Sequence, residues 1–343
     1  MNGLLASLGV SNPVLAAPMA GGPTIPAMVA AATRAGSLGF LAGGYKTAEE
    51  LAAQIGSLRG STPVFGVNLF APNPVPVDRD AYHRYAVAIQ VEADQYGLDL
   101  TSISPLEDDD QWHAKVDLLR ADPVAVVSFT FGIPDPSVIR DLHRAGSLLV
   151  QTVTTPEEAR LAASSGVDAL AVQGFGAGGH YGTLTPDHLP VPVALPDLVR
   201  QVRHVVALPL VAAGGLANRV DVAAVLQAGA DAAMVGTVLL RTDESGASDP
   251  YKSALGEGGD RQTLVTRAFS GRPARALPNL FTARYDAIAP EGYPAIHHLT
   301  TPLRRAAAAA GDSERINLWA GTGHASAQEG SAEKTLSRLA EAL

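Results

Sequence analysis

Residues 173–183, with the sequence QGFGAGGHYGT, place a histidine beside an amide side chain and a run of glycines. An imidazole titrates close to pH 6.5, so His180 can exchange a proton or hold an anion near neutral pH. Other histidines, such as His83, His113, His143 and His204, fall in segments with helical spacing, where a solvated surface position is expected. His180 is therefore the candidate catalytic residue of the chain.

The same stretch resembles a dinucleotide-binding loop, because Gly174, Gly176 and Gly179 fit the pattern G-x-G-x-x-G. That fingerprint requires a helix directly after the glycines, with its N-terminus facing a pyrophosphate. Here prolines follow at positions 186, 190, 192 and 196. Proline lacks a backbone N–H and clashes with the preceding helical turn. We therefore exclude a Rossmann loop at this position.

Glycine and amide residues also stand at the ends of other apolar runs. The pairs Gly214-Gly215 and Gly236-Thr237 close the last two runs, and Asn68 and Gln173 close two earlier ones. Glycine lets backbone N–H groups approach an anion, and amide side chains can hydrogen-bond the edge of a heteroaromatic ring. Each residue alone also fits an ordinary turn or a backbone contact. Together they favour a flat, phosphate-bearing cofactor.

For these residues to form one site, the fold must bring the ends of the apolar runs close together. Eight short apolar runs begin at Val14, Leu38, Pro63, Pro123, Leu148, Ala169, Pro209 and Ala232. They are continuous rather than alternating, as expected of parallel strands buried on both faces. Segments with helical spacing lie between most of them, and they often start at Thr and end at Gly, which are typical helix caps. The pattern predicts an α/β fold, specifically a (β/α)8 TIM barrel, with an open doubly wound sheet as the alternative.

Two long intervals predict insertions. We expect residues 1–260 to form the barrel, with a helical insertion after the third strand (about 72–120) and a second insertion at about 175–196. Residues 261–343 are expected to form a C-terminal extension or lid that packs on the barrel. The acidic residues 108–110 fit a solvated loop or helix start better than a metal site. His297-His298 lacks a third ligand at suitable spacing, so no metal is expected.

Composition excludes several classes of function. The net charge is −9 and the sequence pI is near 5.4, without a basic cluster, so nucleic acid and anionic membranes are poor partners. The chain has no cysteine, which excludes disulfides and cysteine nucleophiles. No apolar run reaches the ~20 residues of a membrane helix, and the N-terminus lacks the basic segment of a signal peptide. A cytoplasmic monomer or homodimer is expected.

At these residues the sequence resembles the nitronate monooxygenases, formerly called 2-nitropropane dioxygenases, and in particular their bacterial class I branch. The resemblance extends from residue 15 to about 325. Its matching segments are LAAPMAGG, AGSLGFLAGGY, FGVNLF, VQGFGAGGHYG, LVAAGGLAN, AGADAAMVGT and LWAGTGHA.

The resemblance implies a barrel that binds FMN without a metal. His180 matches the catalytic histidine of the family. The cofactor-binding positions that it implies are Pro18, Met19, Asn68, Gln173, Gly178, Gly215, Met234, Val235, Gly236 and Thr237. Tyr181 departs from the family, where arginine often follows the histidine, and Tyr45-Lys46 also varies in the family. We expect these differences to bear on substrate preference and not on the catalytic histidine.

The implied reaction is oxidation of alkyl nitronates, of the propionate 3-nitronate type, by O2 to a carbonyl compound and nitrite. His180 would bind the nitronate, and would remove the α-proton of a neutral nitroalkane. One alternative is a flavin-dependent enoyl-acyl-carrier-protein reductase that uses NAD(P)H. Another is a barrel that only binds a phosphorylated ligand. Chemistry like that of IMP dehydrogenase is excluded, because it needs a cysteine.

Overall fold

A computed structural model describes residues 3–259 and 261–341. Its centre is an eight-stranded parallel sheet in the order β1-β9-β8-β6-β5-β4-β3-β2. A further parallel bridge joins Ala16 to Gly39 and connects the two outer strands, so the sheet closes into a barrel. The strands are β1 Val14–Ala16, β2 Phe40–Ala42, β3 Gly66–Ala71, β4 Val126–Phe131, β5 Leu148–Val153, β6 Ala169–Gln173, β8 Leu210–Ala213 and β9 Ala232–Val235. The predicted TIM barrel and its eight strands are confirmed.

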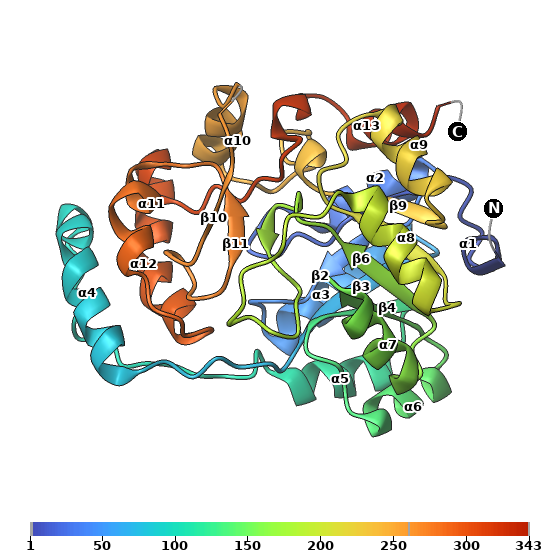
Figure 1. The fold of residues 1–343 in the computed structure, drawn as a ribbon, viewed down its shortest axis with the longest axis horizontal. Coiled ribbons are helices and arrows are strands. Elements are labelled where there is room, and N and C mark those ends of the chain that lie inside the picture. The colour runs from blue at the N-terminus through green and yellow to red at the C-terminus, as the bar shows by residue number, and fades with distance from the viewer. Residues whose placement is uncertain (1–2, 260, 342–343) are drawn as a thin grey trace.

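Helices cover the outside of the barrel (Figure 1). They are α2 Pro26–Arg34, α3 Ala48–Arg59, α5 Trp112–Ala121, α6 Pro136–Ala145, α7 Pro156–Ser165, α8 Leu195–Val205 and α9 Arg219–Gln227. The helix α13 Ala332–Ala340, near the end of the chain, packs against α2 and α9 and completes the cover. Its Leu336 and Leu339 belong to the hydrophobic core between strands and helices.

The predicted cap residues act as expected. Thr47 and Glu50 form a capping box at the start of α3, and the hydroxyl of Thr155 caps α7. Gly146 and Gly166 end α6 and α7 with φ of 101° and 97°, a region that other residues avoid. These local signals explain why the strand–helix units are visible in the sequence.

A second lobe lies beside the barrel (Figure 1). It contains α4 Arg79–Ala93 and η1 Asp94–Tyr96 from the insertion after β3. Its other elements are α10 Asp249–Gly256, β10 Leu264–Thr266, β11 Ala274–Ala276, α11 Leu280–Tyr285, η3 Asp286–Ile288, α12 Ala295–Ala309 and η4 Ser313–Arg315. Three short elements stand elsewhere: α1 Gly3–Ser7, η2 Thr237–Leu239 and η5 His324–Ser326.

The second lobe has a hydrophobic core of its own. Tyr85 and Ile89 of α4 pack with Phe269, Phe281 and Leu299 from the C-terminal part of the chain. The sequence predicted a helix near residues 82–96 and a separate extension that packs on the barrel. It did not predict that the two would share a core, because no local pattern pairs segments almost 200 residues apart.

Glu92 of α4 ties the insertion to this lobe. Its side chain is fully buried, and its carboxylate accepts hydrogen bonds from Arg284 Nη1 (2.6 Å), Arg315 Nε (2.6 Å) and Tyr285 Oη (2.8 Å). Burial by itself raises the pKa of Glu92, but these hydrogen bonds outweigh it, so the net pKa lies below the usual value. The ionised carboxylate is therefore the state that holds the lobe together.

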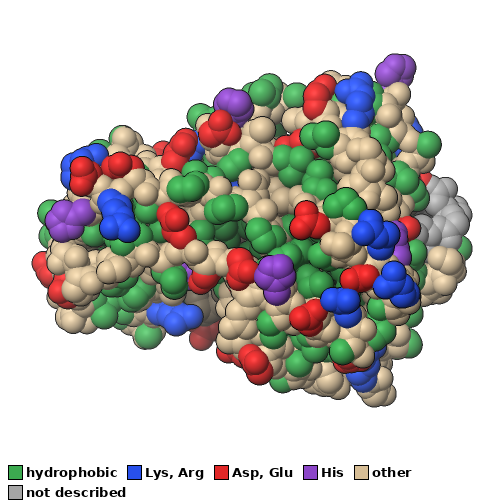
Figure 2. Space-filling model, turned by 90° about the horizontal axis from the view of Figure 1, so that it is seen from below, with side chains coloured by type: hydrophobic (Ala, Val, Ile, Leu, Met, Phe, Trp, Pro, Cys, Tyr) green, Lys and Arg blue, Asp and Glu red, His purple; other side chains and the backbone are tan. Residues whose placement is uncertain are grey.

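On the face shown in Figure 2, acidic and basic side chains are interspersed, without a large area of one sign. Within the described residues, no helix is both long enough and apolar enough to cross a bilayer.

We expect Glu92→Gln to lower the free energy of unfolding by about 3 kcal/mol, because it removes the buried carboxylate that Arg315 Nε and Arg284 Nη1 share and leaves Asp312 as the one remaining carboxylate partner of Arg315. Urea unfolding measures this loss. The control is Glu157→Gln, which removes an exposed carboxylate that faces Arg160 at 3.5 Å, and it should cost less than about 0.5 kcal/mol. Equal effects of the two substitutions would show that Glu92 does not anchor the lobe.

Candidate active site

A large cavity opens at the carboxyl ends of the barrel strands, where TIM barrels place their active sites. Its empty volume is about 1420 Å³, a figure that includes the open mouth. The C-terminal part of the chain contributes part of the wall through Trp319, Gly321 and Gly323. The cavity is therefore walled by both the barrel strand ends and the C-terminal part of the chain.

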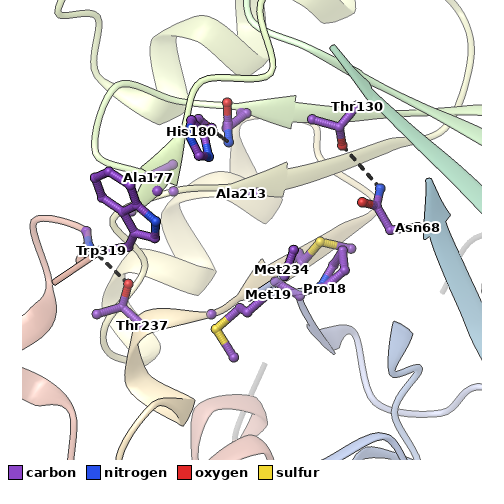
Figure 3. A pocket seen from close by; sticks show the side chains of 18 of the residues that line it. Pro18, Met19, Asn68, Thr130, Ala177, His180, Ala213, Met234, Thr237 and Trp319 are labelled. Atoms are coloured by element: carbon purple, nitrogen blue, oxygen red, sulfur yellow. Dashed lines mark hydrogen bonds between the residues drawn. The ribbon is translucent and has the colours of Figure 1, made fainter. Parts of the chain in front are cut away.

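The structure brings every predicted site residue to this one cavity (Figure 3). These residues are Pro18, Met19, Asn68, Gln173, Gly178, His180, Gly215, Met234, Val235, Gly236 and Thr237. Most come from the ends of β1, β6, β8 and β9 or directly follow β6, whereas Asn68, which the sequence placed at a strand end, is the third residue of β3. Barrel closure brings these strand ends to a single rim.

Gln173 fixes the segment that carries His180. Its Nε2 donates to the His180 carbonyl oxygen (3.1 Å), and its Oε1 accepts from the backbone N–H of Gly182 (2.7 Å). One N–H of the amide has no partner among the described residues and remains available to a ligand. Gln173 thus both shapes the site and offers a donor.

Asn68 offers the complementary group. Its Nδ2 donates to Ser128 Oγ (3.0 Å) and Thr130 Oγ1 (3.1 Å) on the neighbouring strand β4. Its Oδ1 has no hydrogen-bond partner among the described residues. A half-satisfied buried amide at a cavity wall fits a ligand that carries its own donor.

His180 lies on a short strand, not on the free loop that the sequence suggested. The strand β7 Gly179–His180 pairs antiparallel with β11, which in turn pairs with β10. The segment after the glycines does avoid a helix until α8 begins at Leu195, as the prolines predicted. The histidine is therefore held by a small sheet that only the C-terminal part of the chain completes.

Hydrogen bonding and charge set the state of His180. Its Nε2 lies 2.8 Å from the hydroxyl oxygen of the buried Ser270, and that hydroxyl donates to the Arg272 carbonyl oxygen (3.2 Å). The Ser270 oxygen then accepts from Nε2–H, and Nδ1 keeps its lone pair. Burial, and after it the charges of Arg272 and Arg304, lower the pKa of His180 from 6.5 to about 3. The imidazole is neutral at physiological pH.

The glycines at the site have different tasks. A side chain at Gly178 would meet backbone atoms of Ala320 and Gly321 at 2.5–2.7 Å, so this glycine admits the C-terminal segment. At Gly236, a Cβ atom would meet only the flexible Met19 side chain (3.3 Å) and Ala17 (3.5 Å), both of which line the cavity. The fold itself needs Gly178, whereas Gly236 keeps space open for a ligand.

Backbone N–H groups gather near Gly236. Gly214 and Gly215 follow β8 with φ of 110° and 76°, and Thr237 begins η2 after β9. The Thr237 hydroxyl accepts from the Gly321 N–H (3.0 Å), which ties the C-terminal segment to this point. TIM barrels commonly bind phosphate after their seventh and eighth strands. In this chain those strands are β8 and β9, because β7 is not part of the barrel, and Gly214, Gly215 and Gly236 directly follow them.

The cavity carries no fixed charge on its wall: among the described residues, none of its lining side chains is Asp, Glu, Lys or Arg. Two arginines stand behind the wall without a carboxylate within 4 Å. Arg272 is fully buried over the Phe131 ring (4.1 Å), and Arg304 donates to His297 Nδ1 (3.3 Å). Burial lowers the pKa of each arginine to about 10, so both remain cationic at neutral pH. Their field favours an anion in the cavity.

Sequence reasoning missed several wall residues. Tyr45, Phe70, Phe131 and Trp319 line the cavity, and Ser270 contacts His180. Tyr45, Phe70 and Trp319 fall inside the matching segments AGSLGFLAGGY, FGVNLF and LWAGTGHA, but none of the three was predicted to line the site. Phe131 and Ser270 lie outside every matching segment and gave no signal.

Tyr181 does not line the cavity, although its neighbour His180 does. The Tyr181 ring is buried, its hydroxyl bonds the Phe175 carbonyl oxygen, and it receives a hydrogen bond from Arg275 Nη2 (3.3 Å). Tyr181 therefore supports the glycine segment, and its effect on substrate preference stays a prediction.

The acidic loop and the histidine pair do not form a metal site among the described residues. Asp108 pairs with His298 Nε2 (3.1 Å), and Asp109 is exposed as expected. Asp110 differs from the expected solvated residue, because it is mostly buried and pairs with Lys115.

Comparisons with known proteins agree on one family. A family model described as nitronate monooxygenase matches residues 3–341. Two curated relatives are described as probable nitronate monooxygenases. The one from Staphylococcus aureus (strain MRSA252) is 33% identical over 93% of this chain and 91% of its own. The one from Bacillus subtilis (strain 168) is 31% identical over 99% of both chains.

Solved structures show the same likeness. A nitroalkane oxidase from Streptomyces ansochromogenes is 46% identical, with a TM-score of 0.92 over 98% of this chain and 96% of the other. FabK from Thermotoga maritima is 26% identical, with a TM-score of 0.76 over 98% of this chain and 94% of the other.

His297 is a second buried histidine that is neutral in the folded chain, and this predicts that the fold loses stability in acid. Burial, and after it the charge of Arg304, hold the pKa of His297 well below 6.5. The unfolded chain therefore takes up a proton first as the pH falls below about 6.5, and the folded state loses stability. Between pH 6.5 and 5.5, the free energy of unfolding of His297→Gln should fall by about 1 kcal/mol less than that of the unmodified chain. Urea unfolding at both pH values measures the two decreases.

The control is His83→Gln, which removes an exposed imidazole of α4 and should keep the pH dependence of the unmodified chain. A His297→Gln variant that loses as much stability over this pH range as the unmodified chain would contradict the neutral state.

Proposed function

The chain belongs to the nitronate monooxygenase family, a family of flavin-dependent oxidoreductases, and we propose that it oxidises alkyl nitronates with bound FMN and O2, releasing a carbonyl compound and nitrite. Oxidation of a nitronate or nitroalkane follows from the family and from the nitroalkane oxidase neighbour. FMN, O2, the products and the role of each residue belong to the proposal.

The residues at the cavity fit FMN. The glycines after β8 and β9 offer backbone N–H groups suited to a phosphate, and Gly236 leaves space that a side chain would fill. Asn68 Oδ1 and the free N–H of Gln173 form an acceptor and a donor for the edge of a flat ring. Met19 and Met234 supply apolar, adaptable contacts. When bound, FMN supplies the redox chemistry by accepting electrons from the nitronate and passing them to O2.

The observation that supports the proposal most directly is the position and neutral state of His180. It lines the cavity as a neutral imidazole with an unpartnered Nδ1 lone pair, in the field of two arginines and beside no carboxylate. The field binds the nitronate anion, and Nδ1 accepts the α-proton when the substrate is a neutral nitroalkane. The protonated imidazole then stands beside the anion that it has formed, which compensates for its low pKa. A positioned base contributes about 10²–10⁴ in rate.

We expect Gly236→Ala to weaken FMN retention at least tenfold without unfolding the chain, because its Cβ meets only flexible or small side chains of the wall. One tenfold step corresponds to about 1.4 kcal/mol. FMN released on heating and titration of the apoprotein measure the effect. The control is Gly56→Ala in α3, where a Cβ meets nothing within 4 Å. Unchanged FMN binding in Gly236→Ala would remove this residue from the cofactor site.

We expect His180→Asn to lower kcat/KM for nitroethane at least about 100-fold while the value for ethylnitronate falls less than about tenfold, because a preformed nitronate needs no deprotonation. Oxygen consumption measures both substrates. His113→Asn on the exposed side of α5 is the control and should leave both values unchanged. Equal losses on the two substrates would contradict a role as base.

The enoyl reductase alternative differs in its electron donor. Anaerobic bleaching of the flavin by NADH, combined with no oxygen consumption on nitronates, would contradict the proposed function and favour that alternative. A colourless protein that takes up no FMN would favour the barrel that only binds a phosphorylated ligand.

A further inference from the structure

Tyr45, in the turn between β2 and α3, lines the cavity and has an unfavourable backbone conformation. Tyr45 has a φ of 65°, in the left-handed region, where a residue with a bulky side chain is an outlier. That conformation costs about 1–3 kcal/mol and persists only where the surroundings enforce it. The Tyr45 ring lines the cavity, so the strain lies at the functional site.

Asp110 of the acidic insertion enforces this turn. Its Oδ1 accepts the backbone N–H of Tyr45 (2.9 Å), and its Oδ2 pairs with Lys115 Nζ (2.7 Å). The Lys115 side chain is 1% exposed, so this ion pair is shielded from water and fixes the carboxylate in place. Next to it, Gln111 Oε1 accepts the N–H of Ala48 at the start of α3 (3.0 Å).

The acidic segment adopts an unusual backbone to reach the turn. Asp110 and Gln111 have φ of 55° and 54°, and with Tyr45 they make three of the four non-glycine residues with positive φ in the described chain. The fourth is Phe131, at the end of β4, whose ring also lines the cavity. The strained positions thus gather around one end of the cavity.

That end is built of aromatic rings. From His180, the row runs to Phe131 (6.0 Å between ring centroids), to Phe70 (4.6 Å) and to Tyr45 (5.2 Å). The Tyr45 ring stacks on His297 at 4.0 Å with an interplanar angle of 7°, and its hydroxyl receives a hydrogen bond from Tyr293 Oη (3.1 Å). Tyr45 is the last ring of this row, and Tyr293, whose ring centroid lies 5.6 Å from that of His180, also links the two ends.

We propose that Asp110 is a positioning residue. It holds the Tyr45 ring at the end of the part of the cavity lined by His180, Phe131 and Phe70, here called the substrate chamber, and thereby limits the length of the substrate's carbon chain. The proposal rests on the proposed function, because the nitronate group is taken to lie at His180. The organic chain of the substrate then runs along Phe131 and Phe70 and ends at the Tyr45 ring. The methylene groups of a short alkyl chain fit this apolar row.

The test compares kcat/KM for a series of 1-nitronates from ethyl to hexyl in Asp110→Asn, in Tyr45→Gly and in the double variant. Tyr45→Gly removes the wall and relieves the positive φ, so the fold is retained. We expect Tyr45→Gly to raise the hexyl-to-ethyl ratio of kcat/KM at least about tenfold, since each excluded methylene is worth about 10-fold or more.

Asp110→Asn should raise the same ratio by a smaller factor and through KM, with kcat for ethylnitronate within about twofold of the unmodified enzyme, because His180 is untouched. In the Tyr45→Gly background, Asp110→Asn should change the ratio no further, which shows that Asp110 acts through Tyr45. Asp109→Asn, an exposed neighbour, is the matched control and should leave the ratio unchanged.

A ratio that is unchanged in Tyr45→Gly would overturn the inference, as would an Asp110→Asn variant that lowers kcat equally for every chain length. In both cases turnover of ethylnitronate keeps the proposed function intact. Absence of turnover with every nitronate in the unmodified enzyme would contradict the proposed function and this inference together.

Discussion

Closure of eight short parallel strands is the constraint on which the rest of the molecule depends. Ala16 of β1 pairs with Val235 on one side and with Gly39 on the other, so the sheet has no free edge. A closed parallel barrel has all its strand C-termini on one rim. Asn68, Gln173 and Gly236 come from distant parts of the chain and stand on that rim because of closure alone.

The rim becomes an enclosed site only when the second lobe covers it. The C-terminal segment reaches the glycines after β6 because Gly178 has no side chain, and it is tied down by the Thr237–Gly321 hydrogen bond. The strand β11 supplies the partner that turns Gly179–His180 into β7. The second lobe in turn depends on buried Glu92, which joins α4 to α11 and η4. The barrel thus supplies the rim, and the second lobe encloses it and holds His180 in place.

Within the chamber, the buried arginines attract an anion, and the strained turn at Tyr45 positions the wall. Arg272 and Arg304 place positive charge behind a wall that carries none itself, so an anion is attracted while the lining stays apolar. Burial, and after it the same charges, lower the pKa of His180 and keep its imidazole neutral. At the far end, the Asp110–Lys115 pair holds the backbone of Tyr45 in place. Membership of the nitronate monooxygenase family and the likeness to a nitroalkane oxidase support oxidation of a nitronate or nitroalkane.

The sequence by itself determined the barrel units, because continuous apolar runs, helix caps such as Thr47 and glycines such as Gly146 are signals within a few residues of one another. It also determined that no helix directly follows the glycines before His180, since proline acts locally. Only the tertiary structure decided that His180 sits on a strand, that Tyr181 does not line the cavity, and that Tyr45, Ser270 and Asp110 belong to the site. Those contacts join residues 65 to 90 positions apart, and their formation depends on how the closed barrel and the second lobe pack, which no local pattern records.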